Sequence, residues 1–209
     1  MKVLVLGASG ATGREVVRAV IAQDFDVTAF VRDSARLTVG GQRLRVVQGD
    51  VGDAAAVAGA VKGQDAVISA LGVSRPLHAD PVVVDGIRHM LHAMDEQGVA
   101  RLVYLSFIGV RDSRSAAGPL IRFVARFPLR HEIADHETKE ALIRASHCDW
   151  TIVRAPKLSN GEATGRFREG EDIAARSFFP VLSRADVAAF MVRQLRDRTY
   201  VRRAPRILP

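Results

Sequence analysis

Cysteine is nearly missing from this chain of 209 residues, since Cys148 is the only one. A disulfide framework and a cysteine-built metal centre are therefore both excluded within one chain. No apolar run approaches the roughly 20 residues that a membrane-spanning helix needs. The first residues also lack the pattern of a secretory signal with its cleavage site. We expect a protein of the reducing cytoplasm with no membrane partner.

Lysine is also scarce, because only four of the 30 basic residues are lysines. The formal net charge is +7, and a basic surface attracts anions such as nucleotides and nucleic acids. The arginines are scattered, however, and no helix-turn-helix, zinc-finger or aromatic-rich RNA-binding pattern is present. The histidines form no grouping typical of a metal site. We expect neither a nucleic-acid partner nor a bound metal.

What the chain does contain is an alternation of short apolar runs with amphipathic segments. The runs predict strands over residues 2–6, 26–31, 44–50, 65–72, 101–109 and 149–156, and the amphipathic segments predict helices over 12–22, 53–61, 81–97 and 132–146. Asp53 can cap the second of these helices. Near-continuous apolar strands that alternate with helices are typical of a parallel sheet covered on both faces. With right-handed crossovers, this predicts an α/β fold with a Rossmann-like, doubly wound parallel sheet.

The last part of the chain departs from this alternation. TGRFREG (164–170) predicts a short hairpin, SRADVAAFMVRQL (183–195) a helix with a Ser or Asp cap, and YVRRAPRIL (200–208) an edge strand. We therefore expect one domain over residues 1–209, in which about 107–131 and 157–209 build a small C-terminal substrate lobe.

Three glycines punctuate the turn between the first predicted strand and helix, in the sequence GASGATG. Glycine lets a nucleotide pyrophosphate approach the backbone, and the helix N-terminus favours the negative charge of that group. The position in the first βαβ unit fits a dinucleotide site. The alternative is a tight turn that binds no ligand. The candidate cofactor residues here are Gly7, Ser9, Gly10, Ala11, Thr12 and Gly13.

Arg32 follows the second predicted strand, where an acidic residue would hold the ribose 2′-hydroxyl of NAD. Arg32, together with Arg36, can instead pair with a 2′-phosphate, which favours NADPH and leaves NADH possible. Asp33 could still contact a ribose hydroxyl. Arg32 could also be a solvated loop charge.

Six motifs together resemble the atypical short-chain dehydrogenase/reductase superfamily. They are GASGATG, VRD (31–33), GD (49–50), SALG (69–72), RLVYLS (101–106) and DWTIVRAP (149–156). Within the superfamily, the chain is most similar to the NAD(P)H-binding group that includes NmrA-like proteins and flavin reductases of the biliverdin reductase B type. The resemblance covers nearly the whole chain and is specific for fold and cofactor, and much less so for substrate.

The resemblance also implies positions for the cofactor at the carboxyl ends of the strands. Ser106 would lie beside the nicotinamide, as a candidate catalytic residue. Asp50 could instead be a helix-capping or turn carboxylate, Ser106 could be a buried serine bonded to backbone, and Lys157 could be a solvated loop residue. The further cofactor-binding residues that the resemblance implies are Asp50, Val51, Ala70, Leu71, Gly72, Pro156, Lys157 and Leu158.

The chain departs from the superfamily in its catalytic pair. Typical members carry Tyr-x-x-x-Lys on the helix after the fifth strand, but neither Tyr104 nor Tyr200 has a lysine four residues on. The tyrosine place holds Glu132 and the lysine place holds His136. This disfavours alcohol, ketone and epimerase chemistry. His136 could tune the reaction or protonate an acceptor, or it could only hydrogen-bond a ribose or lie on a helix face.

The segment of residues 109–137 is long for a connection, and its aromatic residues and arginines predict a lid over a planar substrate. A surface helix or a dimer contact is the alternative.

Two functions fit the chain as a monomer or a homodimer. One is an NADPH-dependent oxidoreductase that transfers hydride to a planar acceptor such as a flavin or quinone. The other is a non-catalytic NAD(P)H sensor that binds a protein partner.

Overall fold

The computed structural model describes residues 1–72, 81–116 and 130–209. The expected lid residues between 117 and 129 therefore lie outside the described residues. The helices are α1 (Ala11–Ala22), α2 (Ala54–Val61), α3 (Pro81–Glu96), α5 (Arg130–Ala145) and α6 (Arg184–Arg193), with short 3-10 turns η1 (Ser34–Arg36) and η2 (Arg111–Ser115). None of the helices in these ranges is long and apolar enough to cross a membrane.

An eight-stranded sheet runs through the middle of the molecule in the order β3-β2-β1-β4-β5-β6-β10-β8. Its strands are β1 (Lys2–Leu6), β2 (Asp26–Val31), β3 (Leu44–Gln48), β4 (Ala66–Ser69), β5 (Arg101–Phe107), β6 (Asp149–Ala155), β8 (Arg168–Gly170) and β10 (Arg206–Leu208). Neighbouring strands pair in parallel except β10 with β8, which are antiparallel. A separate small sheet pairs β7 (Lys157–Ser159) with β9 (Val181–Ser183) in parallel.

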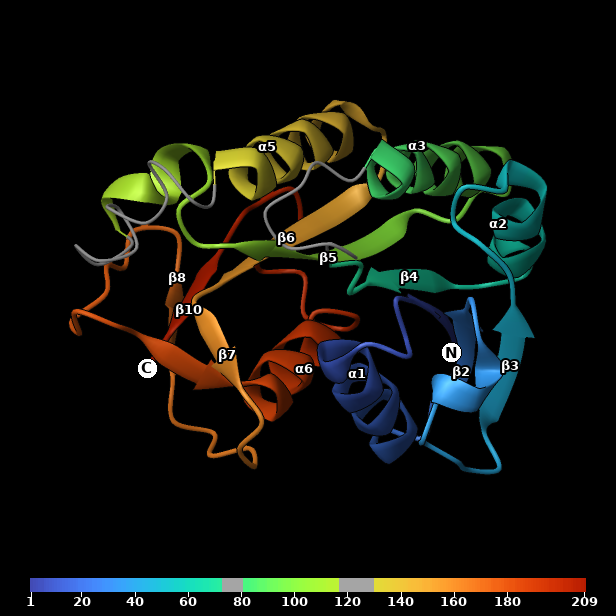
Figure 1. The fold of residues 1–209 in the computed structure, drawn as a ribbon, viewed down its shortest axis with the longest axis horizontal. Coiled ribbons are helices and arrows are strands. Elements are labelled where there is room, and N and C mark those ends of the chain that lie inside the picture. Colours follow the sequence, from blue (N-terminus) through green and yellow to red (C-terminus); the bar gives the residue numbers. More distant parts are fainter. Residues whose placement is uncertain (73–80, 117–129) are drawn as a thin grey trace.

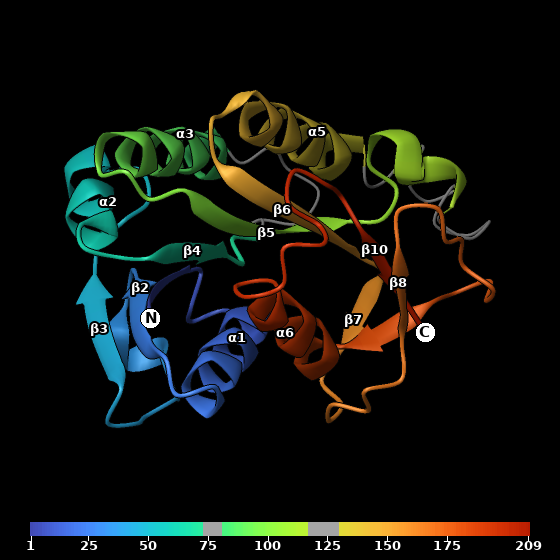
Figure 2. The same ribbon diagram turned by 180° about the vertical axis from the view of Figure 1, so that it is seen from behind.

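Helices cover both faces of the sheet, with α2, α3 and α5 on one face and α1 and α6 on the other (Figures 1 and 2). Because successive residues of a strand point to opposite faces, β1 contributes to two cores. Val3 and Val5 pack in the core beneath α1 and α6, whereas Leu4 and Leu6 pack in the core beneath α2, α3 and α5. The prediction of a doubly wound, mostly parallel α/β sheet is confirmed.

Two helix caps that the sequence predicts are also confirmed. Asp53 accepts hydrogen bonds from the amides of Ala55 and Ala56 at the start of α2. Ser183 accepts one from the amide of Asp186 at the start of α6.

The predicted hairpin over residues 164–170 is wrong. The side chain of Asp186 captures the amides of Thr164 and Gly165 at 2.9 and 2.8 Å, so these residues bind the start of α6 instead of pairing with a neighbouring strand. Only β8 remains extended, and it pairs with β10.

The predicted edge strand over residues 200–208 is also wrong in its place. It shortens to β10, which lies between β6 and β8. The preceding residues already follow β6, because the amide of Ile152 donates to the carbonyl of Arg203 and the amide of Arg154 to that of Pro205. The edge on this side of the sheet is therefore β8.

Asp186 is the polar centre of the contact between α6 and the loop before β8. It is 1% exposed, and it also accepts hydrogen bonds from the hydroxyls of Thr164 and Ser183, at 3.0 and 2.7 Å. Burial raises the pKa of Asp186, but the hydrogen bonds from Ser183, Gly165 and Thr164 outweigh it and hold the pKa below the ordinary value for aspartate.

We expect Asp186→Asn to lower the free energy of unfolding by about 2 kcal/mol at neutral pH, because an amide cannot accept all of these hydrogen bonds. A carboxyl with a depressed folded pKa stabilises the fold above its unfolded pKa of about 3.9, and that stability is lost as the pH falls through the folded value. The difference between the wild type and Asp186→Asn should therefore close below about pH 4. Urea unfolding at several pH values measures it. The exposed Asp24→Asn serves as the control, and a difference for Asp186→Asn that stays constant with pH would contradict the assignment.

Candidate functional site

The turn between β1 and α1 is built so closely that two of its residues have no room for a side chain. Gly7 has a φ of +76°, and a Cβ there would lie 2.7 Å from the carbonyl oxygen of Ala70. A Cβ on Gly13 would lie 2.0 Å from the carbonyl oxygen of Gly7. The amide of Gly10 donates to that same Gly7 oxygen at 3.0 Å and closes the turn. Glycine is therefore required at both positions.

This turn leaves the start of α1 open. Gly10 is the N-cap of α1, and no side chain in the described ranges caps the helix there. The first turn of α1 holds no acidic residue. Gly10 and Ala11 are exposed, and Ser9 and Thr12 are half-buried. An uncapped helix N-terminus with exposed backbone is a favourable place for an anion, because several N–H groups and the helix dipole point at it.

Because the strands are parallel, other predicted residues lie near this turn, at the carboxyl ends of the strands. Ala70 follows β4 and approaches Gly7, while Leu71 is half-buried and Gly72 exposed. Arg32 follows β2 and is exposed. Asp33 has a local role, since its carboxylate accepts from the amide of Ala35 at 3.0 Å and caps η1.

Beyond β3, Asp50 is exposed and accepts from the amide of Gly52 at 2.8 Å. Val51 is buried against α3, where a Cβ on Gly86 would lie 2.7 Å from the Val51 Cβ. The carbonyl oxygen of Val51 lies 3.0 Å from Nδ1 of His89. Asp50 therefore shapes its own turn, as one alternative from the sequence held, and remains exposed at the edge of the sheet.

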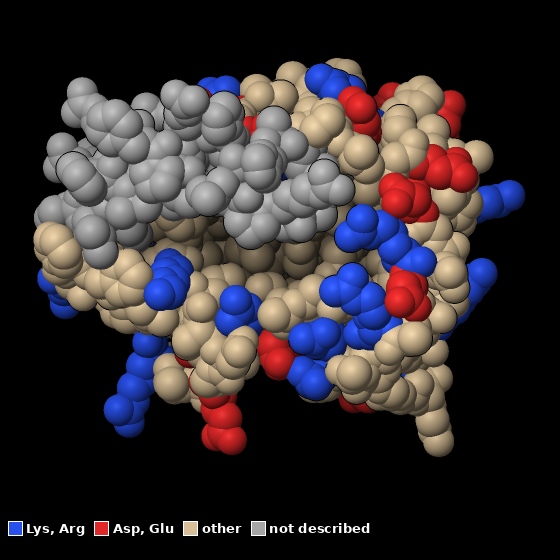
Figure 3. All heavy atoms as spheres, viewed as in Figure 1, with Lys and Arg blue, Asp and Glu red and all other residues tan. Residues whose placement is uncertain are grey.

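The surface over these strand ends is hollowed. Figure 3 shows a hollow near the middle of the face, and Lys and Arg side chains gather to its right, over the strand ends between α1 and α3. A cationic border beside an open helix N-terminus suits a ligand that carries several phosphates.

At the same carboxyl end of the sheet, the chain passes from β6 into β7. Pro156 is buried, Lys157 is exposed and Leu158 is half-buried. The ammonium of Lys157 lies 4.6 Å from the centre of the Phe179 ring, and Phe179 is 41% exposed. Lys157 is thus not merely a solvated loop residue, since it makes a cation–π contact beside the end of β6.

Ser106 lies near the end of β5 and is only 4% exposed. Its hydroxyl donates to Oε1 of Glu140 at 2.7 Å. Glu140 is itself fully buried and is bound by the guanidinium of Arg154. Among the described residues, the Ser106 hydroxyl therefore bonds a side chain rather than backbone. Sequence reasoning missed Glu140 and Arg154, although a charged residue inside the apolar run of β6 was an available signal.

His136 is half-buried on α5. Its Nδ1 lies 3.4 Å from the hydroxyl of Tyr104 on β5. Burial and the nearby ammonium of Lys139 lower the pKa of His136 to about 3. Burial and the carboxylates of Glu140 and Asp135 raise the pKa of Tyr104 above its ordinary value. Both rings are therefore neutral at physiological pH, which gives no support to His136 as a proton donor there.

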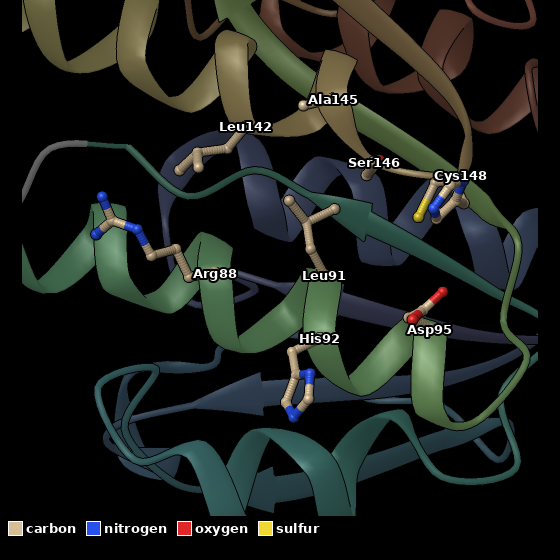
Figure 4. A pocket seen from close by; sticks show the side chains of 9 residues that line it. Arg88, Leu91, His92, Asp95, Leu142, Ala145, Ser146 and Cys148 are labelled. Atoms are coloured by element: carbon tan, nitrogen blue, oxygen red, sulfur yellow. The ribbon is translucent and has the colours of Figure 1, made fainter.

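A pocket of about 300 Å³ lies elsewhere, between α3 and α5 and beside the start of β6 (Figure 4). Its lining residues are Arg88, Leu91, His92, Asp95, Leu142, Ala145, Ser146, His147 and Cys148. It is at the amino end of β6, whereas the residues predicted for the cofactor follow the carboxyl ends of the strands. Among the residues that the structure describes, no group of three potential ligands could hold a metal ion.

We expect Gly13→Ala to destabilise the fold by more than about 2 kcal/mol and to abolish dinucleotide binding, because the new methyl group would displace the backbone at Gly7. Gly59→Ala is the matched control. It lies in α2 with nothing within 4 Å of the added Cβ, so it should stabilise the protein by about 0.5–1 kcal/mol. Thermal unfolding and calorimetric titration with the cofactor measure both effects. Unchanged binding by Gly13→Ala would show that the turn is not the site.

A comparison with known protein families covers most of the chain. A family model described as NAD(P)H-binding matches residues 7–198. A reductase of (4-alkanoyl-5-oxo-2,5-dihydrofuran-3-yl)methyl phosphate from Streptomyces griseus is 35% identical over 152 residues, which cover 73% of this chain and 46% of that protein. An uncharacterised chloroplast protein of Arabidopsis thaliana is 31% identical over 174 residues, covering 78% of this chain and 61% of that protein. The chain spans 46–61% of the length of the first curated relatives that it matches.

Solved structures share the fold over nearly the whole chain. The anaerobillin reductase ChuY of Escherichia coli O157:H7 has a TM-score of 0.81 at 22% identity, covering 99% of this chain and 96% of that one. A short-chain dehydrogenase/reductase of Veillonella parvula, solved in complex with NADP, has a TM-score of 0.81 at 16% identity, covering 99% and 93%. The fold and the glycine turn agree with the family match over residues 7–198, and the chain therefore belongs to the NAD(P)H-binding family.

Proposed function

We propose that this chain is an NADPH-dependent oxidoreductase that transfers hydride to a planar acceptor such as a flavin or quinone. The observation that carries the proposal is the side-chain-free turn at Gly7 and Gly13 below the uncapped start of α1. The pyrophosphate would lie on the amides at the start of α1, because these N–H groups lack a side-chain partner in the described ranges. The similar reductase from Streptomyces griseus and the anaerobillin reductase ChuY support reductase chemistry.

Arg32 would distinguish NADPH from NADH. It is exposed immediately after β2, and η1 begins just beyond it with Arg36 in its only turn. Asp33 caps η1, which leaves the arginines as the charged groups suited to a 2′-phosphate. The adenine would lie by Asp50 and Val51.

The remaining predicted residues would hold the other half of the cofactor. Ala70, Leu71 and Gly72 would line its middle, and Pro156, Lys157 and Leu158 would close over the nicotinamide. When bound, NADPH supplies a hydride for the electron-poor atom of the acceptor. The residues of the chain orient the two rings, and Lys157 offers a cation to an acidic substituent of the acceptor. The predicted lobe of about residues 107–131 and 157–209 would bind the acceptor, and the proton would come from solvent.

A second function remains in competition, namely a non-catalytic NAD(P)H sensor. It is favoured by the neutral pair of Tyr104 and His136, since neither ring is suited to give or take a proton at neutral pH. Hydride transfer to a flavin or quinone does not need such a group, so the two functions differ in turnover and not in binding.

We expect the protein to consume NADPH when FMN or a quinone is supplied, with a loss of reduced-nicotinamide absorbance that depends on both partners. Stopped-flow absorbance under anaerobic conditions measures this. An Ala70→Trp variant, which fills the middle of the proposed cofactor site, is the inactive control. Tight NADPH binding without turnover on any acceptor would favour the sensor.

We also expect Arg32→Ala to weaken NADPH binding about 10–30-fold, because a charge-assisted pair with the 2′-phosphate is lost. NADH binding should change less than about threefold. Arg45→Ala, an exposed arginine on the neighbouring β3, is the control. Calorimetric titration with both cofactors decides the matter, and an equal loss for NADPH and NADH would remove Arg32 from the 2′-phosphate site.

A further inference from the structure

A charged pair is enclosed between β5, α5 and β6, and one serine hydroxyl is bonded to it. Glu140 and Arg154 are both 0% exposed, and Ser106 is 4% exposed. The Ser106 hydroxyl lies 2.7 Å from Oε1 of Glu140. A buried carboxylate accepts and cannot donate, so the hydroxyl proton of Ser106 points at Glu140.

Arg154 holds the carboxylate of Glu140 in one orientation. Its Nε donates to Oε1 at 3.1 Å, and one terminal nitrogen donates to Oε2 at 2.7 Å. The other terminal nitrogen binds both carboxylate oxygens of Asp112, at 2.9 and 3.0 Å. A two-point guanidinium–carboxylate contact fixes the plane of the carboxylate as well as its distance. The acceptor that Ser106 faces therefore cannot rotate away.

The clamp determines what Ser106 can offer to anything else. A free hydroxyl can donate one hydrogen bond and accept two, and it rotates to suit its partner. With its proton committed to Glu140, Ser106 presents only lone pairs. Ser106 is the penultimate residue of β5, and its register partner on β6 is Arg154. Its remaining lone pairs can therefore accept only from an N–H or O–H donor.

We propose that Glu140, held by Arg154, is a positioning residue that makes Ser106 an obligatory acceptor for the amide N–H of the nicotinamide carboxamide. This inference rests on the proposed function, and on the position beside the nicotinamide that the sequence resemblance implies for Ser106. Ser106 then determines specificity for a pyridine ring that carries a carboxamide. It would also favour the ring orientation in which the carboxamide nitrogen faces β5.

The test compares NADPH with its reduced 3-acetylpyridine analogue, in which a methyl group replaces the amide NH₂ and the carbonyl is kept. We expect the wild type to bind NADPH about tenfold more tightly than the analogue. In Ser106→Ala the ratio of the affinity for NADPH to the affinity for the analogue should fall to about one, because NADPH binds more weakly. In Glu140→Gln the ratio should also fall, because Arg154 and Ser106 no longer face a fixed carboxylate.

Thr151→Val is the control for removing a buried hydroxyl. Thr151 is 0% exposed and lies near the amino end of β6, where it bonds Arg101 and the Tyr200 carbonyl. This variant should lose stability and keep the tenfold ratio. If Glu140→Gln does not fold, Ser106→Ala alone decides. NADPH binding with a ratio that Ser106→Ala leaves unchanged overturns this inference only, whereas a wild type that does not bind NADPH overturns the proposed function and this inference with it.

Discussion

The arrangement of the strand ends depends on the backbone contact between Gly13 and Gly7. Because no Cβ separates them, α1 starts directly after β1, and its first amides remain close to the edge of the sheet. The absence of a side chain at Gly7 lets the backbone of Ala70 approach from the neighbouring β4. Three segments therefore converge through backbone alone. A flat ligand with a phosphate bridge gains from such a surface, since its fixed N–H groups need no reorganisation to bind.

Two polar contacts at successive positions join β5 to α5. Tyr104 and Ser106 are two residues apart on the strand, and they meet His136 and Glu140, which are four residues apart on the helix. Two residues of a strand span about 6.7 Å and four residues of a helix about 6 Å, so the two spacings match. In the contact of Tyr104 with His136 both partners are neutral. In the contact of Ser106 with Glu140, the charge of Glu140 is balanced by Arg154. These two polar contacts are thus buried with either neutral partners or a paired charge.

Much of the fold follows from local sequence patterns. The apolar runs of β1 to β6, the glycine turn and the caps at Asp53 and Ser183 are each encoded within a few residues, and the structure confirms them. The places of β8 and β10 are not encoded in this way, because β10 is chosen by partners more than 30 residues away. The same holds for Glu140, whose inward position on α5 has meaning only beside Arg154. The roles predicted for the cofactor residues remain predictions, although the structure brings most of them to one edge of the sheet.

The insertion of β10 between β6 and β8 has a consequence for how the protein is made. On the ribosome, β6 is synthesised about 50 residues before the strand that pairs with its free side. Until residues 203–208 emerge, the backbone donors and acceptors along that side of β6 have no strand to bind, and unpaired strand edges favour association between nascent chains. Closing the sheet late also demands contacts between distant parts of the chain, which slows folding. Because of this strand order, the pairing of residues 203–208 with β6 is the step that completes the sheet.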